Sequence, residues 1–207
     1  MRSETSHLER IKLRELRPTQ LTAGMAEVKE KQARWKLLGK HERQRFLSEH
    51  WFPGVIGPHG FPYIVDHHHL ALALWQSSVK HVRLVILADL AALEEEEFWM
   101  VMDHRDWVHP YDGNGKRVAF SAIPSKITGL VDDPYRSLAE QVRTRGGYAK
   151  SDIAFAEFLW ADFFRRRIPL GKGGAITQSV RSAALTLSAS PAAKHLPGWS
   201  GTDRNNQ

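Results

Sequence analysis

The fold prediction rests on one stretch, Tyr63-Ile64-Val65-Asp66-His67-His68-His69-Leu70-Ala71-Leu72-Ala73-Leu74. Its first four residues are typical of a short buried strand that ends in an acid, and residues 67–76 predict a helix rich in Leu and Ala. Three histidines then occupy the first turn, where backbone N–H groups carry partial positive charge and form an anion site. We therefore expect phosphate to bind at His67, His68 and His69. Asp66 lies beside them, where it could hold Mg²⁺ or accept a hydroxyl proton.

Two other interpretations of these histidines stay open. In one, the helix starts with polar residues, and one histidine is buried in the core with its hydrogen bonds made to the protein. In the other, a metal ion is bound by His67 or His69 with Asp66 and with His104 or His109. Adjacent histidines point about 100° apart on a helix and rarely share one ion, which weighs against the metal site.

Strand and helix patterns alternate on both sides of this stretch. On its N-terminal side, residues 11–16 predict a half-buried strand, and residues 25–38 and 41–49 predict helices. Glycines and prolines between 53 and 62 predict a loop. On its C-terminal side, residues 82–87 have strong β-propensity, and residues 94–102 predict a helix that begins with acids.

The remaining residues predict a hairpin and then mainly helices. The turn Asp112-Gly113-Asn114-Gly115 predicts a hairpin over 107–120. Asp133-Pro134 is typical of an N-cap followed by proline at the first helical position, and it predicts a helix to about residue 145. Residues 151–166 are apolar nearly all round and predict a buried helix, in which Asp162 needs a partner such as Arg165. Residues 179–187 predict a weaker helix.

These patterns indicate an α+β (mixed α/β) fold with a small sheet flanked by helices and a helical C-terminal part. We expect an α/β domain over 1–120, a helical extension over 121–168 that packs on it, and a basic, partly flexible tail over 169–207.

Composition narrows the function. The chain has 207 residues, no cysteine and a formal charge of +6, so disulfides, thiolate catalysis and Cys-ligated zinc are excluded. The positive surplus lies in residues 165–207, which hold seven Lys and Arg against Asp203 alone. The first residues lack the apolar segment of a signal peptide, and no apolar run is long enough to span a membrane. We therefore expect a cytoplasmic protein that does not bind membranes. Its last 43 residues form either a solvated basic helix with a solubilising tail or a surface that contacts DNA non-specifically.

A strand, then Asp-Gly-His-His-Arg, then a helix rich in Leu and Ala is the phosphate-binding motif of the ParB/sulfiredoxin superfamily, and residues 63–74 resemble it. The stretch 16–28 resembles the opening strand, turn and first helix of that superfamily. The stretches 132–139 and 155–162 resemble its putative ParB-like nuclease branch, which is related to ParB-like free-serine kinases. The resemblance covers about residues 11–200 and implies a ParB/sulfiredoxin-like fold.

The resemblance also implies roles for individual residues. Asp66, His68 and His69 match positions that receive nucleotide phosphates in the kinase branch, and Glu27 falls near a catalytic Glu of that branch. The implied catalytic residues are thus Glu27, Asp66 and His68, and ATP, ADP or CTP with Mg²⁺ at Asp66 is the implied ligand.

Two positions depart from the motif, and one branch of the superfamily is excluded. His67 stands where the motif has Gly, and Leu70 stands where it has Arg, which removes a bidentate phosphate contact. Lys126 or Arg136 could replace that charge at the phosphate site. The sulfiredoxin reaction is excluded because its cysteine is absent. No helix-turn-helix pattern follows residue 120, which argues against sequence-specific DNA reading.

Two functions follow from these observations. The first is an Mg²⁺-dependent phosphoryl-transfer or hydrolysing enzyme: a small-molecule kinase, a nucleotide hydrolase or a nuclease, acting on a nucleotide or phosphorylated small molecule. The second is a non-catalytic protein that binds DNA or a partner under the control of a nucleotide.

Overall fold

The computed structural model describes residues 7–201, which form two compact units. Among the described residues, the sheet unit comprises 7–23 and 28–131, and the helical unit comprises 24–27 and 132–201. Helices flank a small mixed sheet and a helical part follows, so the predicted α+β fold class is confirmed.

The main sheet has four strands in the order β1-β5-β3-β4. Their bounds are β1 (His7–Lys12), β3 (Trp51–Ile56), β4 (Pro62–Ile64) and β5 (His81–Asp89). Strand β5 pairs antiparallel with β1 and parallel with β3, and β3 pairs antiparallel with β4. Two further short strands, β2 (Thr22–Ala23) and β6 (Val131–Asp132), form a separate sheet.

Strand β3 and the start of β4 lie where the sequence predicts a loop, so that prediction is wrong for residues 53–56 and 62. In this segment Gly54 has a packing role. A Cβ on Gly54 would lie 2.4 Å from the carbonyl oxygen of Tyr63 and 2.6 Å from Leu84 Cδ1. Gly54 therefore allows the backbones of β3 and β4 to approach closely and does not form a turn.

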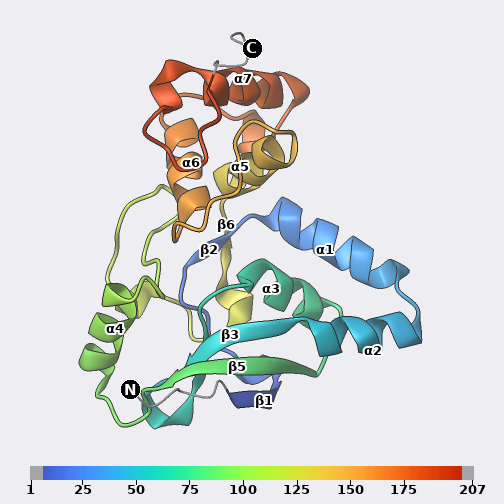
Figure 1. Ribbon diagram of the computed structural model, residues 1–207, viewed down its shortest axis with the longest axis vertical. Helices are drawn as coiled ribbons and strands as arrows, with labels where there is room; N and C mark the ends of the chain where they lie inside the picture. Colours follow the sequence, from blue (N-terminus) through green and yellow to red (C-terminus); the bar gives the residue numbers. More distant parts are fainter. Residues whose placement is uncertain (1–6, 202–207) are drawn as a thin grey trace. The chain divides into compact units, whose positions relative to one another are not determined.

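Four helices accompany the main sheet: α1 (Met25–Leu37), α2 (Lys40–Glu49), α3 (His68–Gln76) and α4 (Glu95–His104). Each lies close to its predicted range, although the first turn of α1 belongs to the helical unit. Helix α3 lies on one side of the sheet and buries residues 71–74 (Figure 1). Part of the core of the sheet unit is a cluster that strands and helix α4 share: Val55, Tyr63, Phe98, Trp99, Met102, Val108 and Ile123.

The hairpin predicted over 107–120 is reduced to a turn. Its strands pair only through an isolated bridge between Tyr111 and Arg117. One carboxylate oxygen of Asp112 accepts hydrogen bonds from the N–H groups of Asn114 and Lys116, both at 2.9 Å. The Lys116 N–H in particular lowers the pKa of Asp112. The predicted turn chemistry is therefore present without a hairpin of named strands.

The helical unit is built from α5 (Pro134–Thr144), α6 (Ala156–Arg165) and α7 (Gln178–Ala189). Trp160 of α6 is fully buried, stacks on Tyr148 at 4.1 Å between ring centroids, and donates from its indole N–H to the carbonyl of Pro197 at 2.8 Å. The predicted helix over 151–166 is too long, because α6 begins after Phe155, which has φ +58°.

The C-terminal segment contributes to the same core. Ala184, Ala193 and Leu196 are buried in one cluster with residues of α5 and α6. The described part of the predicted tail, residues 169–201, therefore packs within the helical unit, and residues 202–207 lie outside the described residues. That the chain divides at residues 120 and 168 into a domain, an extension and a tail stays a prediction.

Candidate functional site

The start of α3 has an unusual backbone. His67 is the N-cap residue and has φ +64°, the left-handed conformation that glycine adopts readily and other residues rarely adopt. Its N–H donates to Oδ1 of the exposed Asp66 at 2.6 Å, and its imidazole Nδ1 lies 4.0 Å from Oδ2 of the same side chain. The chain thus keeps the backbone conformation expected of the motif's glycine although a histidine stands there.

The second histidine of the motif lies in the core. His68 is 3% exposed, and its Nε2 accepts a hydrogen bond from the Thr19 N–H at 3.0 Å. The Thr19 hydroxyl donates to the carbonyl of Ile64 at 2.9 Å. His68 therefore links the loop before β2 to the junction between β4 and α3, and one motif histidine has the core role that the sequence left open. Its catalytic and phosphate-binding roles stay predictions.

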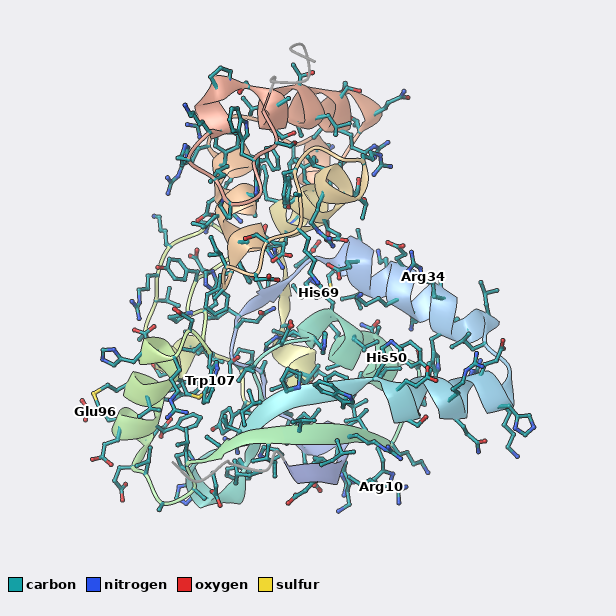
Figure 2. All side chains as sticks on the ribbon, viewed as in Figure 1. Arg10, Arg34, His50, His69, Glu96 and Trp107 are labelled. Atoms are coloured by element: carbon teal, nitrogen blue, oxygen red, sulfur yellow. The ribbon has the colours of Figure 1, made fainter. Side chains whose placement is uncertain are left out.

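A cavity of about 430 Å³ opens beside His67. The first two helices and α3 line it, with four basic or titratable side chains over an apolar floor. The lining residues are Lys31, Arg34, Trp35, Leu38, Phe46, His50, His67, Leu70 and Leu74. Figure 2 labels two of them, Arg34 on α1 and His50 just after α2. Cavities of this size bind small organic ligands in other proteins.

The aromatic walls of the cavity hold each other in place. His50 stacks on Phe46 at 3.8 Å between ring centroids, and its Nδ1 lies 2.9 Å from the Phe46 carbonyl oxygen, so Nδ1 carries the proton. Trp35 meets Phe46 edge-on at 5.7 Å. At the rim, Arg34 forms an ion pair with Glu30 on the same helix. The cavity therefore combines aromatic surface for an uncharged ring with cations for an anionic group.

Most of these cavity residues were missed by sequence reasoning, although a signal exists. Lys31, Arg34, Trp35 and Leu38 recur at the three- and four-residue spacing that places side chains on one helix face. The partner helices could not be identified from that spacing.

The other candidate residues of the sheet unit, Lys126, His104 and His109, do not line this cavity. Lys126 is exposed and precedes a 3-10 turn over Ile127–Gly129, which packs against α3. Within residues 7–201, no group of three or more His, Asp or Glu side chains could hold a metal ion, so the alternative that added His104 or His109 to the motif is wrong. Mg²⁺ at Asp66 stays a prediction, because this ion often takes one or two carboxylates and completes its shell with substrate phosphates and water.

Two predicted residues, Glu27 and Arg136, belong to the helical unit, where the starts of α1 and α5 lie together. The Ala26 N–H donates to the Ser137 hydroxyl at 3.3 Å. A Cβ on Gly24 would lie 2.6 Å from that hydroxyl oxygen. Glu27 in the first turn of α1 and Arg136 in the first turn of α5 therefore come from two helix starts that contact each other.

Arg136 is an unusual buried cation. The residue is only 8% exposed, and its Nε and Nη1 have no hydrogen-bond partner among the described residues. Its guanidinium carbon lies 4.0 Å from the centroid of the Phe158 ring. A buried guanidinium normally pairs with an anion, so this one is suited to receive one.

Asp133 and Asp162, by contrast, have the structural roles that the sequence predicts. Asp133 is buried and caps α5 by accepting from the N–H groups of Tyr135 and Arg136. Arg165 pairs with Asp133 at 2.5 Å and also with Asp162. Burial raises the pKa of Asp162, and the charge of Arg165 opposes that shift. Arg165 is thus held within the unit and does not extend into solvent as a tail cation.

Comparisons with known proteins now place this α+β chain in a class. Residues 9–166 match the family described as putative ParB-like nuclease. The crystal structure of protein Atu1540 from Agrobacterium tumefaciens is similar: 43% sequence identity, 96% of this chain and 98% of that chain covered, and a TM-score of 0.89. A comparison with curated proteins finds no match. The chain belongs to the putative ParB-like nuclease family, and the resemblance stated from the sequence is confirmed.

The expectation about membranes has a limited test. No helix formed by residues 7–201 is long and apolar enough to cross a membrane.

Proposed function

We propose that this ParB-like protein binds a nucleotide in the cavity between α1, α2 and α3, and that it catalyses phosphoryl transfer or phosphoester hydrolysis. The cavity carries the proposal, because it joins the phosphate motif at His67 to an aromatic wall and to two cations, Lys31 and Arg34. A purine or pyrimidine would lie against Trp35 and Phe46. The phosphates would lie toward the basic residues and the start of α3.

Each candidate residue then has a distinct role. Asp66 is exposed and would contribute one carboxylate to an Mg²⁺ ion carried by the nucleotide. The exposed His67 and the half-buried His69 would donate hydrogen bonds to phosphate, with Lys126 as a further cation. His68 would position that helix start from within the core. Glu27 keeps the catalytic role that the resemblance implies for it.

The first experiment measures binding and turnover together. Purified protein is titrated calorimetrically with ATP, ADP and CTP with and without Mg²⁺, and phosphorus NMR follows any reaction. We expect Arg34→Gln to weaken nucleotide binding by roughly tenfold, in keeping with the loss of one charge-assisted hydrogen bond. Lys36→Gln, an exposed change outside the cavity lining on the same helix, is the matched control. Failure of all three nucleotides to bind the wild-type protein would contradict the proposal.

Leu70 offers a complementary gain of function. It lines the cavity at the position where the family motif has Arg. Leu70→Arg should therefore tighten nucleotide binding if phosphate lies there. Unchanged or weaker binding by a correctly folded Leu70→Arg protein would place the phosphates elsewhere.

The missing arginine also favours a second candidate function, a non-catalytic protein that binds DNA or a partner when nucleotide is present. Nucleotide binding without turnover, together with partner binding that depends on nucleotide, would select it. The exposed Arg166, Lys172 and Lys194 would supply non-specific DNA contacts within residues 165–207.

Arg136 is proposed as a phosphate-binding residue of the helical unit. Arg136→Met keeps the length and the apolar packing but removes the charge. We expect the free energy of unfolding to stay equal or rise, because a buried charge without hydrogen-bond partners is costly, while anion binding weakens. A loss of several kcal/mol in stability would show instead that Arg136 is a structural residue.

A further inference from the structure

The outer face of the main sheet carries an unusual row of cations. Arg10 on β1 is directly opposite Arg83 on β5, and Lys12 is directly opposite His81. Their strand neighbours Leu84 and Val82 are 0% and 2% exposed, so the alternation along β5 turns the basic residues to the other face. Figure 2 shows Arg10 on the β1 side of the sheet, away from Arg34 and His50, and none of these basic residues lines the cavity beside His67.

Like charges in directly opposed positions destabilise a sheet. The directly opposed guanidinium groups of Arg10 and Arg83 are therefore costly in the isolated protein. The Arg10 guanidinium also donates a hydrogen bond to Nδ1 of His81 at 3.2 Å, which places the two side chains together on this face. Among the described residues, Glu15 pairs with Lys12 at 3.1 Å and lies 4.0 Å from Arg14. An anionic ligand would remove the repulsion.

Exposed tryptophans flank these cations. Trp51 on β3 is in register with Arg83, so one row across three strands reads Trp51, Arg83 and Arg10. Trp51 is 48% exposed, and Trp75 at the end of α3 is 44% exposed. We name Arg10, Lys12, Arg83, His81 and Trp51 the basic sheet face.

Two hollows that share His81 border this face. One of about 620 Å³ is lined by Trp75 together with Lys12, Arg14 and Lys80, among others. The other, of about 260 Å³, is lined by Arg10 and Arg83 together with residues of α2. Both hollows therefore mix cations with other side chains in a concave surface, and the larger one includes an exposed indole.

We propose that the basic sheet face binds single-stranded nucleic acid, with the phosphates at the arginines and lysines and unstacked bases on Trp51 and Trp75. Alternating cations and exposed aromatic rings are the combination by which proteins bind single strands without sequence preference. A duplex keeps its bases stacked inside and cannot offer them to an indole ring. A lipid surface is less suited to this face, because membrane binding inserts protruding apolar side chains, whereas the cations and Trp75 line hollows.

The test uses the full-length protein and fluorescently labelled oligo-dT and oligo-U, with binding followed by anisotropy over a range of salt concentrations. The double variant Arg10→Gln/Arg83→Gln should bind at least tenfold more weakly. Its log–log salt slope should fall in magnitude by about 1.4, since each neutralised phosphate of a single strand contributes about 0.7. The control Lys36→Gln/Lys40→Gln removes the same charge from exposed positions outside this face and should leave both quantities nearly unchanged.

The tryptophans separate this proposal from simple charge attraction. Trp75→Ala should weaken single-strand binding by roughly tenfold, and Trp75→Phe should retain most of it, because either aromatic ring can stack on a base. Thermal unfolding of each variant checks that it is folded, and removal of the opposed arginines should not lower the unfolding temperature.

Four results would overturn the proposal. In the first two, the wild-type protein does not bind single strands at low salt, or the lysine control loses as much binding as the arginine variant. In the other two, a matched duplex binds more tightly and Trp75→Ala has no effect, or the protein binds only to phosphatidylserine vesicles. Arg10, Arg83 and Trp75 do not line the cavity between α1, α2 and α3, so a loss of binding in these variants tests the basic sheet face and not that cavity.

Discussion

Helices α3 and α5 begin in opposite ways. Helix α5 starts at a buried Asp133 that caps two N–H groups and pairs with Arg165, so its polar atoms are used within the fold. Helix α3 starts at an exposed His67 in a left-handed conformation, beside an exposed Asp66. The second start has a strained backbone and leaves polar groups at the surface, next to a cavity of about 430 Å³.

This difference shows how the same sequence signal can have two meanings. An acid before a helix predicts both starts, Asp66 for α3 and Asp133 for α5. Only burial separates the structural acid from the candidate functional one, because a buried carboxylate must be paired within the protein and an exposed one is available to a ligand.

The largest expected effect is on α5. Asp133→Ala removes the cap and one partner of the half-buried Arg165, and we expect it to lower the free energy of unfolding by about 3 kcal/mol. Asp66→Ala should cost less than about 1 kcal/mol, because the side chain is exposed, while abolishing the proposed Mg²⁺-dependent reaction. Urea unfolding measures both, and equal losses would remove the distinction between the two helix starts.

The next largest expected loss of stability distinguishes the buried His68 of α3 from its half-buried neighbour His69. His68→Leu leaves the buried Thr19 N–H without its acceptor, and we expect a loss of about 2 kcal/mol. His69→Leu, at the neighbouring half-buried position, should cost clearly less. Native-state hydrogen exchange at the Thr19 amide would report the lost bond directly, and unchanged protection there would refute the assignment.

The strain at His67 can be separated from its imidazole. His67→Gly and His67→Ala both lose the ring, but only glycine is relaxed at φ +64°. We expect the Gly variant to be more stable than the Ala variant by about 1 kcal/mol in urea unfolding. Equal stability would mean that the left-handed conformation carries no cost there.

The smallest effect concerns pH and the packing of α5. Burial raises the pKa of Tyr148, whose hydroxyl donates to the Ala139 carbonyl of α5 at 3.1 Å. In the unfolded chain tyrosine ionises near pH 10, so stability is fully present below that value and is lost as the pH rises toward the higher folded pKa. Tyr148→Phe should cost about 1 kcal/mol at pH 7 and flatten the alkaline decline. If the stability of the variant declines as steeply at alkaline pH as that of the wild type, other titratable groups cause the decline.

Much of the secondary structure could be predicted because it depends on local chemistry. The cap at Asp133, the strand around residues 82–87 and the helix after His67 all follow from neighbouring residues. Strand β3 could not be predicted, since its Gly54 is fixed by the backbone of Tyr63 in β4 and by Leu84, which lie nine and thirty residues further along the chain. The start of α6 was also predicted wrongly, because the apolar pattern alone does not locate a residue in the left-handed conformation such as Phe155.

The sequence by itself determined the family, the run Asp66–His69 that carries the resemblance, and the helix starts, because these depend on short runs of residues. The tertiary structure decided which histidine is buried, which acids are paired, and which cations share a surface. Lys31, His50 and His67 line one cavity, and Arg10 meets Arg83 across two strands, only because the chain brings distant segments together. Charge and hydrogen bonding act over a few ångströms in space, so their consequences appear only when that space is defined.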